Sequence, residues 1–300
     1  MSKNPEKFII DIYPITPLSL RGRQFYSYLW DVEIPRGSLV SIPFFKRNIE
    51  GIVIHNRRDF ERFGNIKLKK INKILEDKFL TENQLKLAEF IFDYYFSPIG
   101  TVLKFFVPKR TKIRNLQPTT NNLQLKKINP TTEQQNAVDE ITKNHSKFNP
   151  PAGGQKFLLF GPASSGKTEA YIHSILKLKK DNPESQFLIL LPELTLTPQA
   201  IERYGAYFKP EEIVLLHSKI SKGQFYSNWK KIKNGEVKII IGTRMAVFAP
   251  FKNLKLIVID EEQDISFKQW DMNPRYDART VSEKLAEIYK ANLALGSAAP

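Results

Sequence analysis

The segment that most constrains the fold is 161–168, which reads G-P-A-S-S-G-K-T. It follows the apolar run 157–160 and precedes a helix-like stretch over 169–180, so it predicts a strand, a Gly-rich loop and a helix in that order. Gly161 and Gly166 allow the backbone to curl until its N–H groups point inward at a phosphate. The spacing therefore predicts a phosphate-binding loop. The alternative, a Gly-rich turn that only caps a helix, is disfavoured by the eight ordered positions.

Two side chains of this loop carry the expected nucleotide chemistry. Lys167 would supply a positive charge to the β- and γ-phosphates. The hydroxyl of Thr168 would be a ligand for Mg²⁺. The loop residues expected to bind the nucleotide are Gly161, Ser165, Gly166, Lys167 and Thr168.

A second acidic motif lies about ninety residues downstream. The apolar run 256–259 is typical of a parallel strand that is buried on both faces, and it ends in D-E-E-Q over 260–263. In open α/β sheets, ligands bind at the carboxyl ends of the strands. We therefore expect Asp260 to hold Mg²⁺ through water and Glu261 to orient or deprotonate an attacking water. The alternative is that these acids merely solubilise a turn.

Composition limits the class of protein. The 300 residues suggest about two domains, and the formal net charge of +15 is unevenly placed. Residues 1–130 carry 23 basic and 12 acidic side chains, whereas 131–300 carry 23 and 19, so the front part is the better candidate for a polyanion surface. Charged runs are often just solvated faces, so charge alone does not decide this. The lack of cysteine excludes disulfides and Cys-bound zinc within this chain. No apolar stretch reaches 18 residues and no signal peptide is evident, so we expect a soluble protein without a membrane partner.

The front part is expected to be rich in β structure. Short β-branched and aromatic runs over 8–54, separated by Pro and Gly, predict a small barrel or sheet. Helical spacing over 81–96, with Thr81 as N-cap, predicts a helix. The stretch 101–130 has seven basic and no acidic residues, which is typical of a linker that could contact phosphate. We place the domains at 1–107 and 131–300, with a basic linker over 108–130.

The second domain alternates strands and helices, which predicts a parallel sheet wrapped by helices. The expected strands are 156–160, 186–191, 213–216, 237–241, 254–259 and 292–295, and the expected helices are 168–180, 197–208 and 221–233.

Smaller signals suggest further contacts. Gln134 opens a helix in T-E-Q and could read the adenine of ATP, or the three residues could form only a capping box. Thr243 and Arg244 follow an expected strand, where a hydroxyl and a guanidinium suit a sugar-phosphate backbone. The loop over 267–276 interleaves aromatic rings with cations, which is typical of a base-stacking surface. An ordinary loop with buried rings is the alternative.

Taken together, the motifs resemble a known family. In chain order, T-E-Q, G-P-A-S-S-G-K-T, L-P-E-L-T-L-T-P-Q, L-H-S, I-G-T-R-M-A-V-F-A-P-F, I-V-I-D-E-E-Q-D and L-G-S-A-A-P are similar to the first motor domain of superfamily 2 DNA helicases. More narrowly, they resemble the bacterial primosomal replication-restart helicases, the PriA family. V-S-I-P-F, G-I-V and Y-Y-F-S-P-I-G in the front part match that family's DNA-binding domain.

The resemblance implies an α/β protein with a small β-rich N-terminal domain that holds the 3′ end of a nascent strand, followed by a RecA-like P-loop motor domain. Such a motor uses ATP and Mg²⁺ to unwind forked DNA in the 3′ to 5′ direction during primosome assembly and restart of stalled forks. The implied partners are forked or single-stranded DNA, single-stranded DNA-binding protein and other primosome proteins, in the nucleoid region of a bacterial cytoplasm. The residues expected to contact DNA are Thr243, Arg244, Phe267, Lys268, Trp270, Arg275 and Tyr276.

The chain also departs from the family pattern. Gln263 stands where the family has His, Ala299 stands where it has Thr, and F-Y-S-Y over 25–28 lacks the acid of the family's F-D-Y. The stretch 108–131 is too short for the winged-helix domain of relatives, and the sequence stops at Pro300, before the positions at which relatives have a second motor domain and a zinc-binding cysteine cluster. We therefore expect this chain alone to bind nucleotide weakly and hydrolyse it poorly.

Two other functions stay open at this stage. One is a helicase-inactive DNA-binding or primosome scaffold protein, favoured by the altered Gln263 and Ala299. The intact Lys167, Asp260 and Glu261 argue against it. The other is a different superfamily 2 translocase, which the family-like front domain disfavours.

Overall fold

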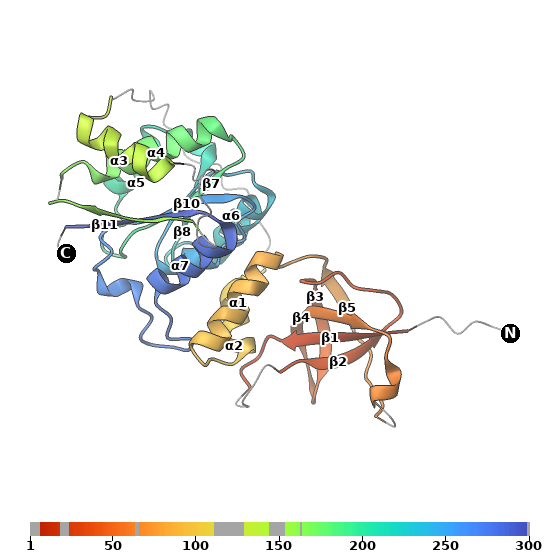
Figure 1. The fold of residues 1–300 in the computed structure, drawn as a ribbon. Coiled ribbons are helices and arrows are strands. Elements are labelled where there is room, and N and C mark those ends of the chain that lie inside the picture. The colour runs from red at the N-terminus through yellow and green to blue at the C-terminus, as the bar shows by residue number, and fades with distance from the viewer. Residues whose placement is uncertain are drawn as a thin grey trace. The chain divides into compact units, whose positions relative to one another are not determined.

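The computed structural model describes residues 7–18, 24–63, 66–110, 129–143, 154–162 and 164–298. The chain divides into two compact units, residues 1–107 and 108–300 (Figure 1). Most of the expected basic linker, residues 111–128, lies outside the described residues, as does Ala299.

The first unit is built on a five-stranded antiparallel sheet. Its strands, in the order β2-β1-β4-β3-β5, are β1 (Phe8–Pro14), β2 (Tyr26–Trp30), β3 (Leu39–Phe44), β4 (Arg47–Arg57) and β5 (Lys73–Glu76). The residues just before β5 hydrogen-bond back to β2, because the Leu29 N–H donates to the Lys69 carbonyl at 2.8 Å and the Ile71 N–H donates to the Leu29 carbonyl at 3.2 Å. These bonds join the segment before β5 to β2, and the antiparallel sheet confirms the β-rich first part that the sequence predicted as a small barrel or sheet.

The interior of the first unit contains the inward-facing residues of the strands. Ile10, Ile12, Val40, Ile42 and Val53 are fully buried and pack in one cluster. These are the β-branched residues whose alternation predicted the strands.

Two helices complete the first unit: α1 (Glu82–Tyr94) and α2 (Ile99–Phe106), with a 3₁₀ turn η1 (Phe60–Phe63) before β5. Thr81 is the N-cap of α1, as expected, and forms a reciprocal capping box with Gln84. A Cβ added to Gly100 would lie 2.2 Å from the Thr16 carbonyl oxygen, so only glycine allows α2 to lie this close to the end of β1.

The second unit is a six-stranded parallel sheet in the order β6-β11-β10-β7-β9-β8. The strands are β6 (Lys156–Phe160), β7 (Gln186–Leu190), β8 (Ile213–Leu216), β9 (Ile239–Gly242), β10 (Leu254–Ile259) and β11 (Asn292–Ser297). The helices are α3 (Thr132–Thr142), α4 (Lys167–Asp181), α5 (Pro198–Gly205), α6 (Lys222–Asn234) and α7 (Ala278–Tyr289), with 3₁₀ turns η2 (Pro210–Glu212), η3 (Arg244–Phe248) and η4 (Ile265–Phe267). This arrangement confirms the expected RecA-like fold.

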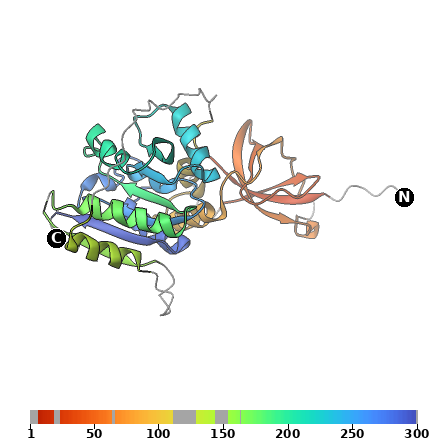
Figure 2. The same cartoon turned by 90° about the horizontal axis from the view of Figure 1, so that it is seen from above.

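Helices cover both faces of this sheet. Helices α3 and α4 lie side by side on one face, and α7 lies on the other (Figures 1 and 2). On the first face, Tyr171 and Ile175 of α4 and Tyr204 of α5 pack against Phe187 and Ile241 of the strands. Helix α7 was not among the expected helices. Its signals are an N-cap at Asp277 and buried Val281 and Leu285 at helical spacing.

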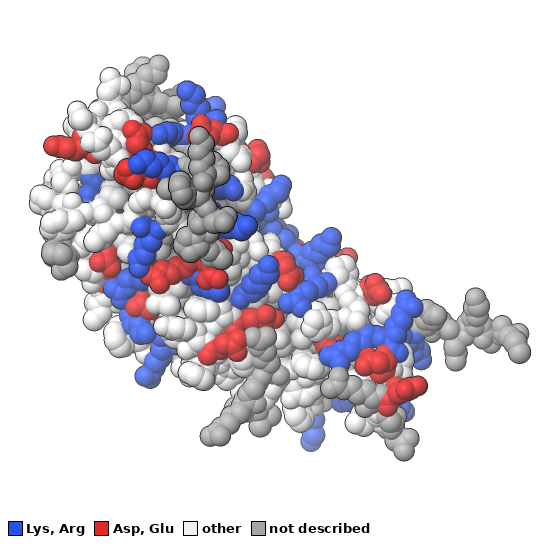
Figure 3. Space-filling model, in the orientation of Figure 1, with Lys and Arg blue, Asp and Glu red and all other residues white. Residues whose placement is uncertain are grey.

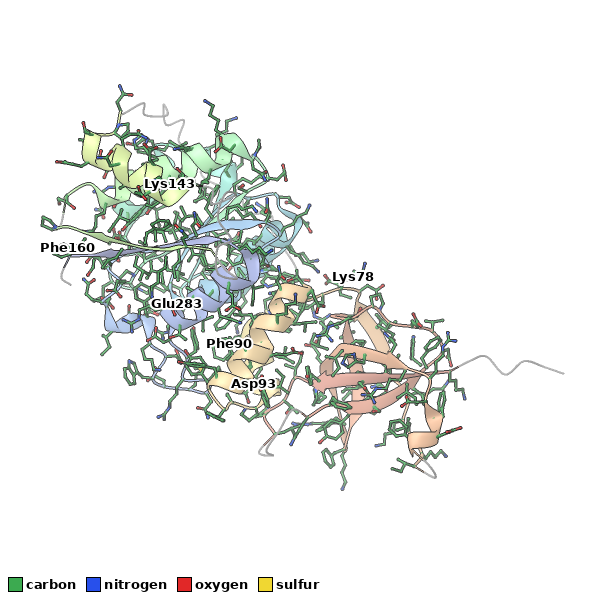
Figure 4. All side chains as sticks on the ribbon, in the orientation of Figure 1. Lys78, Phe90, Asp93, Lys143, Phe160 and Glu283 are labelled. Carbon is green, nitrogen blue, oxygen red and sulfur yellow. The ribbon has the colours of Figure 1, made fainter. Side chains whose placement is uncertain are left out.

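Strand β6 is an edge strand rather than a fully buried one. Its alternate residues are exposed, and the exposed fractions of Leu158 and Phe160 are 59% and 61%. Figure 4 shows Phe160 at the outer end of this strand and Glu283 on α7, whose carboxylate pairs with Lys156. The apolar run before the Gly-rich loop is therefore half exposed, although its hydropathy resembles that of a buried strand.

Candidate functional site

A pocket of about 320 Å³ lies at the carboxyl ends of the parallel strands in the second unit. It is lined by the Gly-rich loop and the first turn of α4, by residues of α5, and by the acids that follow β10. Ser165, Gly166, Lys167 and Thr168 therefore share one cavity with Asp260 and Glu261. The two motifs that the sequence separates by about ninety residues come together as expected.

The Gly-rich loop turns sharply into α4. Gly166 is the N-cap of the helix and has φ of +87°, a left-handed conformation that favours glycine. The Lys167 ammonium bonds to carbonyl oxygens of its own loop, at 2.6 Å to Gly161 and 3.1 Å to Pro162. The charge is therefore held over the loop, where phosphate oxygens could replace the two carbonyl acceptors.

Gln134 contacts this loop from α3. Its side-chain oxygen accepts a hydrogen bond from the Thr131 N–H at 2.9 Å, and its own N–H donates to the Thr131 hydroxyl at 3.3 Å, so the capping box is present. Its side-chain amide nitrogen also donates to the Gly166 carbonyl at 3.4 Å. Both the oxygen and the nitrogen of the Gln134 amide therefore have hydrogen-bond partners. The residue lies next to the loop but is not among those that line the pocket.

Asp260 and Glu261 stand where β10 ends. The Asp260 N–H donates to the Leu190 carbonyl of β7 at 3.0 Å, which fixes the turn against the neighbouring strand. Burial raises the pKa of the Asp260 carboxyl above its ordinary value, and the negative charge of Glu261 adds to the rise. Glu261 has φ of +50°, a left-handed conformation that is uncommon for a non-glycine residue and occurs preferentially at functional sites.

Gln263, which replaces the family's His, joins the acids to the end of β11. It donates to a Glu261 carboxylate oxygen at 2.8 Å and accepts from the Ser297 hydroxyl at 3.0 Å. The Ser297 carbonyl in turn accepts from the Gly161 N–H at 3.2 Å. The amide therefore uses both its donor and its acceptor between the acidic motif and the segment that contacts the Gly-rich loop.

The structure adds three residues, in or beside this pocket, to the site residues predicted from the sequence. Arg203 of α5 donates to the Thr168 hydroxyl at 3.4 Å and lines the cavity. Tyr171 and Tyr204 are buried beside it. Burial and the charge of Asp260 raise the pKa of both phenols, so both remain protonated. No local motif marks these positions, because two different helices carry them to the site.

The expected DNA-contacting residues fall into two groups. Thr243, Phe267 and Tyr276 are buried, with exposed fractions of 4%, 1% and 1%, and the ring of Tyr276 packs edge-on against Phe248 at 4.9 Å. In this conformation the rings of Phe267 and Tyr276 are not exposed for stacking on a base, and the Thr243 side chain, expected at the sugar-phosphate backbone, is also buried. Trp270 is 58% exposed, and the Lys268 ammonium lies 5.9 Å from the centre of its ring.

Arg244 holds this loop rather than projecting freely. Its guanidinium donates to the Gln269 side chain and to the Ser266 carbonyl, both at 2.9 Å, and pairs with Glu193 at 3.3 Å. It thus links the segments after β7 and β9 to the loop that follows the acids.

Arg279 supports the other end of this loop. It forms two hydrogen bonds with Asp277, at 2.9 and 2.7 Å, and donates to the Glu262 carbonyl at 2.9 Å. Burial alone would raise the pKa of Asp277, but the hydrogen bonds from Arg279 outweigh it, so the pKa is lowered. The loop tip that carries Trp270 and Arg275 is therefore fastened at both ends, and both of these side chains are exposed.

The first unit has a pocket of its own, of about 270 Å³, between β2, the end of β3 and the residues before β5. Tyr26, Tyr28, Phe44 and Phe45 line it together with Lys69. The ring of Phe44 packs edge-on against Tyr26 at 5.0 Å and against Phe45 at 4.8 Å. Burial, and to a smaller extent Tyr26, raises the pKa of Tyr28 to about 12. The aromatic rings offer stacking faces, and the lysine offers a charge for phosphate.

A buried acid lies directly beneath this pocket. Ser27 occupies the position at which the F-D-Y pattern would place an acid, and its hydroxyl donates to Asp11 of β1 at 2.6 Å. Asp11 is fully buried and pairs with Arg57 at 2.5 Å. The carboxylate missing from the pocket rim is therefore present one strand away, behind the Ser27 hydroxyl.

On the face drawn in Figure 3, Lys and Arg side chains lie among Asp and Glu side chains on each unit. Within the described ranges, no group of three or more His, Asp or Glu side chains is arranged so that it could hold a metal ion. None of the described helices is long and apolar enough to cross a membrane.

Two family models match the chain. Residues 131–300 match the DEAD/DEAH box helicase model, and residues 15–108 match the 3′ DNA-binding domain of PriA. Both matches agree with the resemblance expected from the motifs, which is confirmed.

Curated relatives give the same result. The replication restart protein PriA of Rickettsia prowazekii is 34% identical over 305 aligned positions, which cover 98% of this chain and 42% of the relative. PriA of Helicobacter pylori strain J99 is 35% identical over 269 positions, which cover 88% of this chain and 39% of the relative. PriA of Bacillus subtilis is 44% identical over 144 positions, which cover 48% of this chain and 17% of the relative. The chain thus spans about two fifths of the length of the first two relatives.

With more than half of its residues matched by the helicase model and most of the remainder by a 3′ DNA-binding domain, the chain belongs to the DEAD/DEAH box helicase family.

Proposed function

We propose that this chain is the DNA-binding and first motor part of an ATP-dependent DNA helicase that restarts stalled replication forks. The observation that carries the proposal is the meeting of the Gly-rich loop and the acidic pair in one pocket of the second unit. The first unit matches a 3′ DNA-binding domain and would bind the DNA on which the motor acts.

In the second unit, the loop N–H groups and Lys167 would bind the phosphates of ATP. Thr168 and Asp260 would hold Mg²⁺, because both line the pocket and offer the hard oxygen ligands that this ion prefers. A site with one carboxylate and one hydroxyl suits Mg²⁺, which usually keeps several waters and takes its other ligands from phosphate. When bound, the ion would neutralise charge that develops on the phosphates.

Glu261 would orient or deprotonate the water that attacks the γ-phosphate. Its carboxylate lines the pocket and is held by the Gln263 amide at 2.8 Å. The left-handed backbone at Glu261 turns the chain immediately after Asp260, and we assign the two carboxylates different tasks.

Single-stranded DNA would cross the loops of the second unit near Trp270. The exposed ring offers a stacking face, and Lys268 and Arg275 offer charge for phosphate. Arg244 would act through the loop that it holds, since its guanidinium is engaged by Glu193, Gln269 and the Ser266 carbonyl.

The aromatic pocket of the first unit would take the 3′-terminal nucleotide of a nascent strand. The base would stack on a ring of the pocket, while the Ser27 hydroxyl, which donates to Asp11, keeps its lone pairs for a sugar hydroxyl. The absence of an acid at the rim therefore does not remove polar recognition. An oligonucleotide with a 3′-hydroxyl should bind more tightly than the same oligonucleotide with a 3′-phosphate. Equal affinities would contradict end recognition.

The wider setting is proposed from the relatives, which are bacterial replication restart proteins. Primosome proteins and single-stranded DNA-binding protein would be the protein partners, in the nucleoid of a bacterial cytoplasm.

The test is ATP turnover by the 300-residue chain with and without forked DNA. We expect weak turnover, because in this class a finger from the opposite motor domain contributes about 10³ to 10⁵ in rate. Any turnover should disappear in Lys167→Ala. Tight fork binding with no nucleotide binding at all would contradict the motor function and favour a DNA-binding scaffold.

A further inference from the structure

Tyr171 is the buried polar group that the proposed mechanism does not use. It lies on α4 one helical turn after Lys167, and none of its surface is exposed. Among the described residues, its hydroxyl has no hydrogen-bond partner. Buried hydroxyls in native proteins are nearly always hydrogen-bonded, because leaving one unpaired is costly. An acceptor for this proton is therefore to be sought nearby.

Gly296 of β11 shows where that acceptor is. A Cβ built on Gly296 would lie 1.9 Å from the Tyr171 hydroxyl oxygen and 2.9 Å from Asp260 Oδ1. Both oxygens therefore face the same point above the Gly296 backbone, and the missing side chain leaves the space between them open. The position of the glycine is fixed, because its carbonyl accepts from the Glu262 N–H at 2.8 Å.

Asp260 has acceptor capacity to spare. The described residues give it one hydrogen bond, from the Glu261 N–H to Oδ1 at 3.2 Å, whereas an ionised carboxylate can accept about four. A phenol is a donor that can approach this carboxylate without adding a charge that would compete with a metal ion.

We propose that Tyr171 is a positioning residue for Asp260: in the nucleotide-bound state its hydroxyl donates to the Asp260 carboxylate and fixes the orientation in which that carboxylate holds Mg²⁺. Gly296 is part of the same device, because only glycine leaves room for the contact. The inference rests on the proposed nucleotide function of the pocket. It assigns the orientation of the Asp260 carboxylate to Tyr171 and Gly296, which lie outside both sequence motifs.

The first experiment compares Tyr171→Phe with the unchanged 300-residue chain. Affinity for a fluorescent ATP analogue is measured by titration in Mg²⁺ and again in EDTA. Since a hydrogen bond to a charged group is being removed, we expect roughly tenfold weaker binding in Mg²⁺ and unchanged binding in EDTA. Tyr289→Phe is the matched control, because it removes a phenol hydroxyl that donates to the Phe251 carbonyl at 2.6 Å and does not line the pocket.

Equal affinities of Tyr171→Phe and the unchanged chain in Mg²⁺ would overturn the inference and leave the proposed function standing. Equal losses in Mg²⁺ and in EDTA would also overturn it, because a merely structural role has no metal dependence. If the unchanged chain bound no nucleotide under either condition, the proposed function would fail and the inference with it.

The second experiment tests the geometry without nucleotide. Gly296→Ala should lower the melting temperature, because the added methyl group collides with the Tyr171 hydroxyl. The same substitution in Tyr171→Phe should cost clearly less, since the colliding oxygen is gone. Additive effects of the two substitutions would overturn the contact.

Discussion

The two pockets of this protein are built in different ways, and the difference explains why only one of them could be found in the sequence. The nucleotide pocket takes its central residues from two short segments, 161–168 and 260–263, that directly follow strands β6 and β10. The aromatic pocket of the first unit takes single residues from β2, β3 and the segment before β5. A pocket built from short contiguous segments has a recognisable motif in the sequence. A pocket built from single side chains of separate strands has no such motif.

Loss of a charged side chain at each pocket should also affect the free energy of unfolding of the two units differently. Asp11 is fully buried beneath the aromatic pocket, and its partner Arg57 is 24% exposed. Asp11→Ala should lower the free energy of unfolding of the first unit by about 3 kcal/mol, because it leaves a partly buried guanidinium without its carboxylate. Hydrogen exchange, read separately for each unit by mass spectrometry, should show faster exchange in β1 and β4 and unchanged exchange in the second unit. Equal acceleration in both units would mean that the two are not independent.

At the nucleotide pocket, loss of a charged side chain should weaken ATP binding rather than lower the free energy of unfolding. Lys167→Ala should weaken ATP binding on the order of 100-fold, because a charge that contacts phosphate is removed. Its affinity for single-stranded DNA at the first unit should not change. Lys177→Ala on the same helix is the matched control, since Lys177 pairs with Asp139 at the surface at 2.7 Å. Similar losses for the two variants would show that general charge, not the loop geometry, attracts the nucleotide.

The aromatic pocket should depend on stacking. Phe45 is 80% exposed with φ of +50°, and Phe96, outside the pocket, is 93% exposed with φ of +49°. Phe45→Ala should weaken single-stranded DNA binding roughly tenfold, as expected for loss of one stacking face. Phe96→Ala makes the same chemical change in the same backbone conformation and should have no effect. A shift of equal size for both in a fluorescence anisotropy titration would rule out the pocket as the DNA site.

The smallest expected effect concerns pH. The pKa of Asp277 is lowered by Arg279, so the pair stabilises the fold fully above the ordinary carboxyl pKa. That contribution is lost as the pH falls through the lowered pKa. Between about pH 5 and pH 3, which lie on either side of the ordinary carboxyl pKa, the unchanged chain should lose up to about 1 kcal/mol more stability than Asp277→Asn. Chemical denaturation at the two pH values measures this difference, and parallel losses would show that the pair contributes nothing.

Local patterns predicted the elements that depend on local chemistry. The Gly-rich loop was predicted because Gly166 needs a left-handed turn, and the Thr81 cap because its hydroxyl satisfies an N–H three residues away. The sequence left open whether the first unit forms a barrel or a sheet, since the link between β2 and the segment before β5 is a single bridge between Leu29 and Lys70.

Long-range contacts account for the features that the sequence did not reveal. Arg203 contacts Thr168 from a different helix, and the Tyr171 hydroxyl lies beside Gly296 of β11. Asp11 contacts Ser27 across a strand pair. The burial of Phe267 was also hidden, because an aromatic residue in a cation-rich loop has the same local signature whether it is exposed or buried. Only the fold distinguishes the two.

The amide of Gln263 has a consequence for how the acidic motif can change state. A histidine at this position could respond to a proton, but an amide does not titrate in the physiological range. An ionised carboxylate can only accept, so a flip of the amide would turn its oxygen toward Glu261 and break that hydrogen bond. Glu261 is therefore joined to Ser297 at the end of β11 through a side chain that does not itself titrate in the physiological range.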